Sequence, residues 1–286
     1  MSSLFVLIQY LLPHHLLSRF VGFFAEGSFL KNVLIRSFVR RYKVDMSEAA
    51  ISDPLEYPSF NTFFTRELKA DARPIDSDEA AIVCPADGAV SALGLINDEQ
   101  ILQAKGRDYS ISDLLGGDQQ LANEFRNGAF ATIYLSPRDY HRVHMPLAGR
   151  LQKLIYVPGR LFSVNQATAN AVPNLFARNE RAICVFSTEA GPMCVVLVGA
   201  MIVAGIETIW SGQVCPSIGS RSIRQTEYSD NEPPIQLATG AELGRFKLGS
   251  TAIVLFAPEA ITLNQDLDAE SPVKMGQRLA TLVKQS

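Results

Sequence analysis

Short apolar segments separated by turn residues are the feature that most limits how this chain can fold. From Ala81 onward, strings such as "AFATIYL" (129–135) and "TAIVLF" (251–256) alternate with Gly, Pro, Asn and Asp. Segments of this length between turn signals are typical of strands in a β-rich domain. A chain of 286 residues can bury about 75% of its unfolded surface, so such a domain needs no disulfide for stability.

The first 68 residues follow another pattern. The segment 4–24 is mostly apolar, but Pro13, His14 and His15 interrupt it near its centre. A helix that spans a membrane needs about 20 predominantly apolar residues, and no A-x-A site that would indicate a signal peptide follows. We therefore predict an α+β protein with a helical, membrane-associating region over residues 1–68 and a mainly β, barrel-like domain over residues 69–286.

The membrane prediction depends on two neighbouring patterns. After Pro13, apolar residues recur at helical spacing, at Leu16, Leu17, Phe20, Val21, Phe23 and Phe24. Between Glu26 and Asp45 every charged residue is basic, namely Lys31, Arg36, Arg40, Arg41 and Lys43. An apolar helix beside a basic segment is typical of a peripheral site on an anionic bilayer. The alternative is a helical hairpin packed on the protein's own core, with its basic face in water.

The cysteine spacing and the overall charge indicate which bonds and partners are not expected. The four cysteines, Cys84, Cys184, Cys194 and Cys215, are scattered and form no C-x-x-C pair. We expect them to be small buried apolar residues of a protein from a reducing compartment. The formal net charge is −3, and we expect no nucleic-acid partner.

Three segments carry the reactive side chains. They are "CPADGAV" with Asp87, "LSPRDYHRVHMP" with His141 and His144, and "LGST" with Ser250. An Asp, a His and a Ser can form a nucleophilic triad, but the G-x-S-x-G setting of many serine hydrolases is absent. Instead Gly249 precedes Ser250, and a residue without Cβ leaves its carbonyl open to a neighbouring hydroxyl. The pattern indicates a backbone bond that Ser250 can attack, aided by the high effective molarity of a tethered nucleophile.

Longer motifs then point to a family. They are "FFTRELKADARPI" (63–75), "CPADG" (84–88), "KGRDYSISDLLGG" (105–117), "YLSPRDYHRVHMPLAG" (134–149) and "LFSVNQATANAVPNLFARNERAI" (161–183). With them, the chain resembles bacterial phosphatidylserine decarboxylase proenzymes over most of its length. The resemblance implies that Ser250 attacks the Gly249 carbonyl and forms an ester. Elimination at the Ser250 Cα then leaves a dehydroalanine, which hydrolyses to a covalent pyruvoyl group and ammonia.

The same resemblance implies the product chains and the reaction. The beta chain, residues 1–249, and the alpha chain, residues 250–286, stay associated, and the pyruvoyl carbonyl forms a Schiff base with the amine of phosphatidylserine. It withdraws the electrons left by decarboxylation, so that carbon dioxide and phosphatidylethanolamine are formed in phospholipid biosynthesis without a metal. We expect a peripheral enzyme on the cytoplasmic face of the cell membrane, and whether two copies form a homodimer stays open.

The resemblance also implies residue roles. Asp87, His144 and Ser250 form the self-cleavage triad, with His144 as the base and Asp87 as the group that orients it. His141 transfers a proton during decarboxylation. Arg138 and Arg142 flank the histidines and could pair with a phosphate or carboxylate, although solvated surface arginines are the simpler interpretation.

Three other functions stay open on the residues alone. A biotinyl or lipoyl carrier is suggested by the glycine-containing segment "SPVKMGQRLATL" around Lys274, a position too near the end of the chain for a central carrier hairpin. We take this likeness as a clue to barrel-like architecture, not to function. A metal hydrolase could use His141, His144 and Asp87. A membrane-anchored structural protein would contain "LGST" only as a bend.

Overall fold

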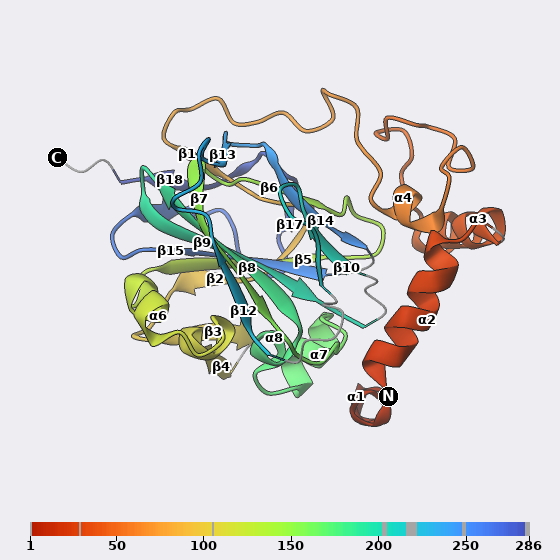
Figure 1. Ribbon diagram of the computed structural model, residues 1–286, viewed down its shortest axis with the longest axis horizontal. Helices are drawn as coiled ribbons and strands as arrows, with labels where there is room; N and C mark the ends of the chain where they lie inside the picture. The colour runs from red at the N-terminus through yellow and green to blue at the C-terminus, as the bar shows by residue number, and fades with distance from the viewer. Residues whose placement is uncertain are drawn as a thin grey trace.

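The computed structural model describes residues 2–28, 30–104, 106–201, 205–215, 222–247 and 250–283. Its largest unit is a nine-stranded antiparallel sheet with the order β12-β7-β8-β9-β15-β5-β2-β17, in which β13 also pairs with β7 (Figure 1). The strands are β2 (Gly88–Leu95), β5 (Ala129–Leu135), β7 (Gly149–Val157), β8 (Arg181–Thr188), β9 (Gly191–Gly199), β12 (Arg224–Glu227), β13 (Gln236–Leu237), β15 (Ser250–Phe256) and β17 (Pro272–Val273).

Smaller sheets cover one face of this large sheet. One has the order β11-β10-β14-β6 and another the order β1-β18-β16. Their strands are β1 (Ala81–Val83), β6 (Arg142–His144), β10 (Gly205–Thr208), β11 (Gly212–Cys215), β14 (Glu242–Lys247), β16 (Ile261–Leu263) and β18 (Arg278–Leu282). Alternate residues of β15, such as Ala252 and Val254, share a core with Val143 of β6 and Phe246 of β14.

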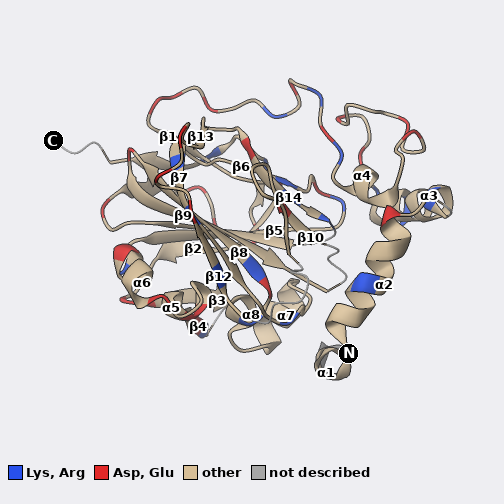
Figure 2. Ribbon diagram, viewed as in Figure 1, with Lys and Arg blue, Asp and Glu red and all other residues tan. Residues whose placement is uncertain are grey.

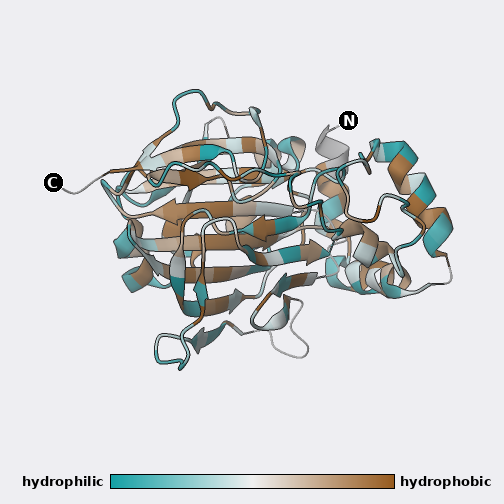
Figure 3. Ribbon diagram, turned by 90° about the horizontal axis from the view of Figure 1, so that it is seen from above, coloured by the Kyte–Doolittle hydropathy of each residue, from teal (hydrophilic) through white to brown (hydrophobic). Residues whose placement is uncertain are grey.

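Short helices and a hairpin cover the other face. They are α5 (Ile111–Leu114), α6 (Gln119–Phe125), α7 (Gln166–Ala171), α8 (Leu175–Arg178) and the pair β3 (Gln100–Ala104) and β4 (Arg107–Ser110). Ile253 and Leu255 of β15 pack on this side with Phe125 of α6 and Phe176 of α8. Because β15 has a core on both faces, all seven of its residues are buried. Figure 3 shows long apolar stretches along the central strands of the molecule.

The N-terminal helices lie beside the strand-rich body (Figure 1). They are α1 (Ser2–Leu11), α2 (His14–Glu26), α3 (Lys31–Tyr42) and α4 (Phe60–Phe64). A separate apolar cluster joins α2, α3 and α4 through Ala25, Ile35 and Phe63. His14 fixes the start of α2 to the body, because its Nδ1 accepts a hydrogen bond from the Leu161 backbone N–H.

The predicted α+β class and the N-terminal helices are confirmed. The described strands form open sheets and no closed barrel, so the barrel-like prediction is not confirmed. Gly-punctuated segments near residue 274 suggested a barrel, but β17 is a two-residue edge strand paired only with β2. All four cysteines are buried and free, as expected. None of the described helices is long and apolar enough to cross a membrane.

Arg181 connects the large sheet to two helices. Its side chain is buried and donates hydrogen bonds to the carbonyl oxygens of Asp113, Leu114, Ala177 and Asn179. These carbonyls lie at the ends of α5 and α8, where a helix leaves carbonyls without internal partners.

We expect Arg181→Met to lower the free energy of unfolding by about 3 kcal/mol, because it leaves several buried acceptors unsatisfied. Urea denaturation measures the loss. The control is Arg126→Met, which removes a half-exposed arginine paired with Asp98 and Glu99 and should cost less than about 1 kcal/mol. Equal stability of the two variants would contradict the assignment.

Candidate active site

Ser250 is the first residue of β15. It lies between Leu135 of β5 and Gly199 of β9 in the middle of the large sheet. The residue is 0% exposed, and its Oγ has no hydrogen-bond partner among the described residues. A buried hydroxyl without a partner costs free energy, and here it leaves the Ser250 oxygen free to react. Gly249, on the other side of the predicted cleavage bond, lies outside the described residues.

The side chain of Ser250 points toward the layer that carries the histidines. Strand residues alternate between faces, so Ser250 shares the face of Ala252 and Val254, which pack toward β6 and β14. His144 lies on β6, and His141 immediately precedes that strand. The fold therefore directs Ser250 toward β6, but Val143 occupies the core-facing position of that strand, so its neighbour His144 points to the other face of β6.

His141 has one free nitrogen. Its Nε2 is 3.0 Å from the Ser136 carbonyl oxygen, and because a carbonyl can only accept, the proton is on Nε2 and Nδ1 keeps its lone pair. This Nδ1 is buried and has no partner in the described part of the chain. Phe64 stacks on the imidazole at 4.0 Å. Burial, followed by the nearby Arg66 cation, lowers the pKa of His141 to about 3, so the ring is neutral.

Strand register places His141 nearer than His144 to the predicted cleavage bond. The Phe246 backbone N–H donates to the His141 carbonyl, whereas His144 is paired with Glu242. Phe246 is four residues closer to Ser250 along β14, which corresponds to about 13 Å of strand. Ser136, which bonds the His141 ring, directly follows the Leu135 that pairs with Ser250.

Both ring nitrogens of His144 are occupied. Nδ1 is 2.9 Å from the Gly240 carbonyl oxygen and Nε2 is 3.0 Å from the Tyr140 hydroxyl. Since the carbonyl only accepts, Nδ1 carries the proton and Nε2 accepts from Tyr140. Burial lowers the pKa of His144. Its neutral form is thus a base with its lone pair covered by one tyrosine.

Asp87 is held by an arginine. The Arg73 guanidinium donates to both carboxylate oxygens, and the Met275 backbone N–H donates to Oδ1. Gly88 follows Asp87, and a Cβ there would lie 2.1 Å from the Tyr134 carbonyl oxygen, so only glycine lets β2 approach β5 at this point. In this arrangement Asp87 bonds Arg73 rather than the imidazole that it was predicted to orient.

The remaining sequence candidates have ordinary structural partners. Arg142 is buried and pairs with Glu67 and Glu242, so the surface interpretation is wrong for it. Arg138 is exposed, as that interpretation expects. Lys274 forms an ion pair with Glu48. No group of three or more potential ligands among the described residues is arranged to hold a metal ion.

Sequence reasoning missed Arg66, Arg73 and Tyr140. All three lie within the quoted motifs "FFTRELKADARPI" and "YLSPRDYHRVHMPLAG", so the motifs contained the signal. Their importance depends on burial and contacts, which the sequence does not give.

The site fits a pyruvoyl group made from Ser250. That group needs a serine at the start of a new chain and space free of competing hydrogen bonds around its oxygen. Ser250 begins β15, and its hydroxyl has no partner among the described residues.

Comparisons with known proteins show the family of the chain. A family model described as phosphatidylserine decarboxylase matches residues 60–281, and a second, described as PSD, matches residues 4–43. The phosphatidylserine decarboxylase proenzyme of Ectopseudomonas mendocina (strain ymp) is 60% identical over 281 residues, which cover 97% of this chain and 98% of the relative. The proenzyme of that name from Pseudomonas aeruginosa (strain LESB58) is 60% identical over 288 residues, 100% of this chain and 99% of the relative. The chain therefore belongs to the phosphatidylserine decarboxylase family.

Proposed function

We propose that this chain is a proenzyme that cuts itself between Gly249 and Ser250 and then converts phosphatidylserine to phosphatidylethanolamine and carbon dioxide. The observation that carries the proposal is the buried hydroxyl of Ser250, at the first position of a central strand and without a partner among the described residues. As a family member the chain is a carboxy-lyase, which displaces the carrier, metal hydrolase and structural alternatives.

The sheet pairing supports continued association of the two product chains. Residues 250–283 include β15, which pairs with β5 and β9, and β17, which pairs with β2. They also include β18, which pairs with β1. The partners all belong to residues 1–249, so separation of the chains would break the centre of the large sheet and expose both of its cores.

Self-cleavage requires a base for the Ser250 hydroxyl proton. We assign this role to His144, with Asp87 beside it. Tyr140 must release Nε2 before His144 can accept a proton, since that nitrogen carries the only lone pair of the neutral ring. The proton then goes to the amide nitrogen that leaves Gly249, and an ester replaces the peptide bond.

Decarboxylation requires an electron acceptor and a proton carrier. The pyruvoyl group supplies the electron-withdrawing carbonyl that ordinary side chains lack. We assign proton transfer to His141, whose free Nδ1 can take a proton from the substrate ammonium group and return it to the substrate Cα after carbon dioxide leaves.

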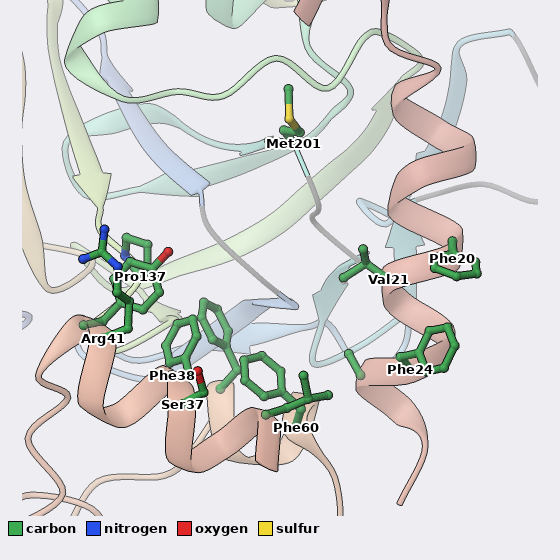
Figure 4. A pocket seen from close by; sticks show the side chains of 13 residues that line it. Phe20, Val21, Phe24, Ser37, Phe38, Arg41, Phe60, Pro137 and Met201 are labelled. Atoms are coloured by element: carbon green, nitrogen blue, oxygen red, sulfur yellow. The ribbon is translucent and has the colours of Figure 1, made fainter. Parts of the chain in front are cut away.

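An apolar cavity beside His141 is suited to lipid chains. It has a volume of about 480 Å³ and lies among α2, α3, α4 and the loop after β5. Figure 4 shows Phe24, Phe38, Phe60 and Pro137 around it. Phe64 belongs to the same lining and stacks on His141. We therefore place the acyl chains here, where apolar surface is removed from water.

Helix α2 supports a peripheral position on an anionic membrane. Its buried positions are His14, Ser18 and Ala25, whereas Leu16 and Phe23 are 68% and 77% exposed. The small residues Ser18 and Ala25 thus face the protein while Leu16 and Phe23 face outward, an arrangement unlike that of an ordinary globular helix. Leu16 and Phe23 of the sequence-predicted apolar stripe therefore lie on the outward face, whereas Phe20, Val21 and Phe24 also line the apolar cavity.

Basic residues continue this surface along α3 (Figure 2). Arg36, Arg40 and Arg41 are exposed, whereas Lys31 donates to the Leu55 and Tyr57 carbonyls and is therefore a structural residue. Exposed arginines beside an apolar face favour anionic headgroups. We place this surface on the cytoplasmic face of the cell membrane. The separate core of α2, α3 and α4 supports a distinct membrane-associating region that ends near residue 68.

We expect the double variant Leu16→Ser, Phe23→Ser to bind anionic vesicles at least about tenfold more weakly, because two large apolar side chains no longer enter the bilayer interface. Vesicle co-sedimentation measures the change. Leu95→Ser, which removes an equally exposed leucine at the end of β2, should bind normally. Unchanged sedimentation of the double variant would overturn the membrane assignment and leave the self-cleavage proposal intact.

A further inference from the structure

A second cavity lies next to the apolar one. It is polar, has a volume of about 470 Å³, and includes Arg66, Asp87 and Tyr140 in its lining. Three chain segments contribute to both cavities. Tyr42, Phe64 and Pro137 line the apolar cavity, and the nearby residues Lys43, Arg66 and Arg138 of the same segments line the polar one. A single ligand with an apolar part and an ionic part can therefore occupy both.

Arg66 has unused donors at this boundary. It is 4% exposed, and its Nη2 donates to the Arg138 carbonyl at 3.0 Å and to the Asp139 carbonyl at 3.4 Å. Its Nε and Nη1 are buried without a partner among the described residues. A buried guanidinium whose donors are unsatisfied is costly, and an incoming anion would remove that cost.

The carboxylates of the cavity wall are engaged elsewhere. Asp87 is bonded by Arg73, and Glu48 pairs with Arg73 and Lys274. Asp139 accepts from the backbone N–H and hydroxyl of Ser136. Asp45, the fourth carboxylate of the lining, accepts from the Ser47 backbone N–H. None of these carboxylates forms an ion pair with Arg66. The arginine therefore keeps a positive charge that can attract an anion, and it lies beside the histidine assigned to proton transfer.

We infer that Arg66 binds the phosphodiester of the phospholipid substrate through Nε and Nη1, with the acyl chains in the neighbouring apolar cavity. The inference rests on the proposed function. A guanidinium fork matches two oxygens of a phosphate. The substrate carboxylate is the poorer occupant. A cation bound to it would stabilise the ground state, and this stabilisation would be lost as the carboxylate becomes carbon dioxide, which slows the chemical step.

The test uses Arg66→Met and Arg66→Lys in nonionic-detergent mixed micelles. The phosphodiester is unchanged by the reaction, so removing its contact with Arg66 weakens binding of the substrate and of the transition state equally. KM should therefore rise about 10- to 100-fold, with kcat within about threefold of the wild type. Lysine keeps the charge but loses the fork, so it should recover only part of the affinity. Arg126→Met, a residue in neither cavity lining, is the control and should match the wild type.

Product inhibition separates the two anionic groups. Phosphatidylethanolamine keeps the phosphodiester and lacks the carboxylate, so its inhibition constant should rise by the same factor as KM in Arg66→Met. A raised KM with unchanged inhibition by this product would assign Arg66 to the carboxylate and overturn the inference. Wild-type kinetics in Arg66→Met would overturn it as well.

A measurement on the unmodified protein covers the case in which the variants fail to fold. Phosphatidylethanolamine should inhibit the wild type at least about tenfold more strongly than diacylglycerol with the same acyl chains. Equal inhibition by the two lipids would overturn the phosphodiester site. If the wild type formed no phosphatidylethanolamine at all, the proposed function would fail instead, so the two failures are distinguishable.

Discussion

Ser250→Ala is expected to leave a single uncut chain of 286 residues without decarboxylase activity. Alanine has no hydroxyl to attack the Gly249 carbonyl, and without cleavage no pyruvoyl group is formed. The denatured intact mass of the purified protein measures this directly. The wild type should give residues 1–249 and a second fragment, 250–286, that is lighter by one ammonia than a fragment beginning with serine.

Thr251→Ala is the matched control for this experiment. Thr251 is also buried in β15, and its hydroxyl also has no partner among the described residues, but it points to the opposite face of the sheet. This variant should still cut itself. A single full-length mass from active wild-type protein would contradict the proposal, because Ser250 would then be only a residue at the start of a strand.

His141→Ala is expected to cut normally and to turn over about 10²- to 10⁴-fold more slowly, the usual contribution of a positioned general acid or base. The cut is read from the intact mass and the turnover from carbon dioxide release. His144→Ala is the reciprocal variant and should remain uncut or cut slowly. Uncut His141→Ala would transfer the role of base to His141, which is the histidine that the strand register brings nearer to Ser250.

The pH profile provides a second measure of the His141 role. Burial lowers its pKa to about 3, so the ring is neutral at every pH above that value and protonation begins only as the pH falls toward it. We therefore expect kcat of the wild type to show no step near pH 6.5 from this group. A step near pH 6.5 that disappears in His141→Ala would mean that the ring is solvated during turnover.

The sequence alone determined the chemistry and the class of fold. Alternation of short apolar segments with turn residues predicted the strands, because the spacing of apolar residues and the positions of turn residues are local properties of the sequence. The motifs around Asp87, His141, His144 and Ser250 predicted the reactive groups, because each motif is contiguous in the chain. The same local patterns suggested a barrel, whereas the open sheets depend on which strands pair at long range.

Only the tertiary structure decided which of these groups keep unpaired hydrogen-bonding atoms, and which face of each helix or strand lies against the protein. Helical spacing predicted an apolar stripe on α2, but the body of the protein determines that Ser18 packs inward and Phe23 faces outward. Arg66, Arg73 and Arg142 all lie within motifs. Carboxylates pair with Arg73 and Arg142, whereas Arg66 keeps donors that have no partner in the described part of the chain. Burial and hydrogen bonding depend on contacts between segments that are far apart in the sequence, and therefore no local pattern of residues predicts them.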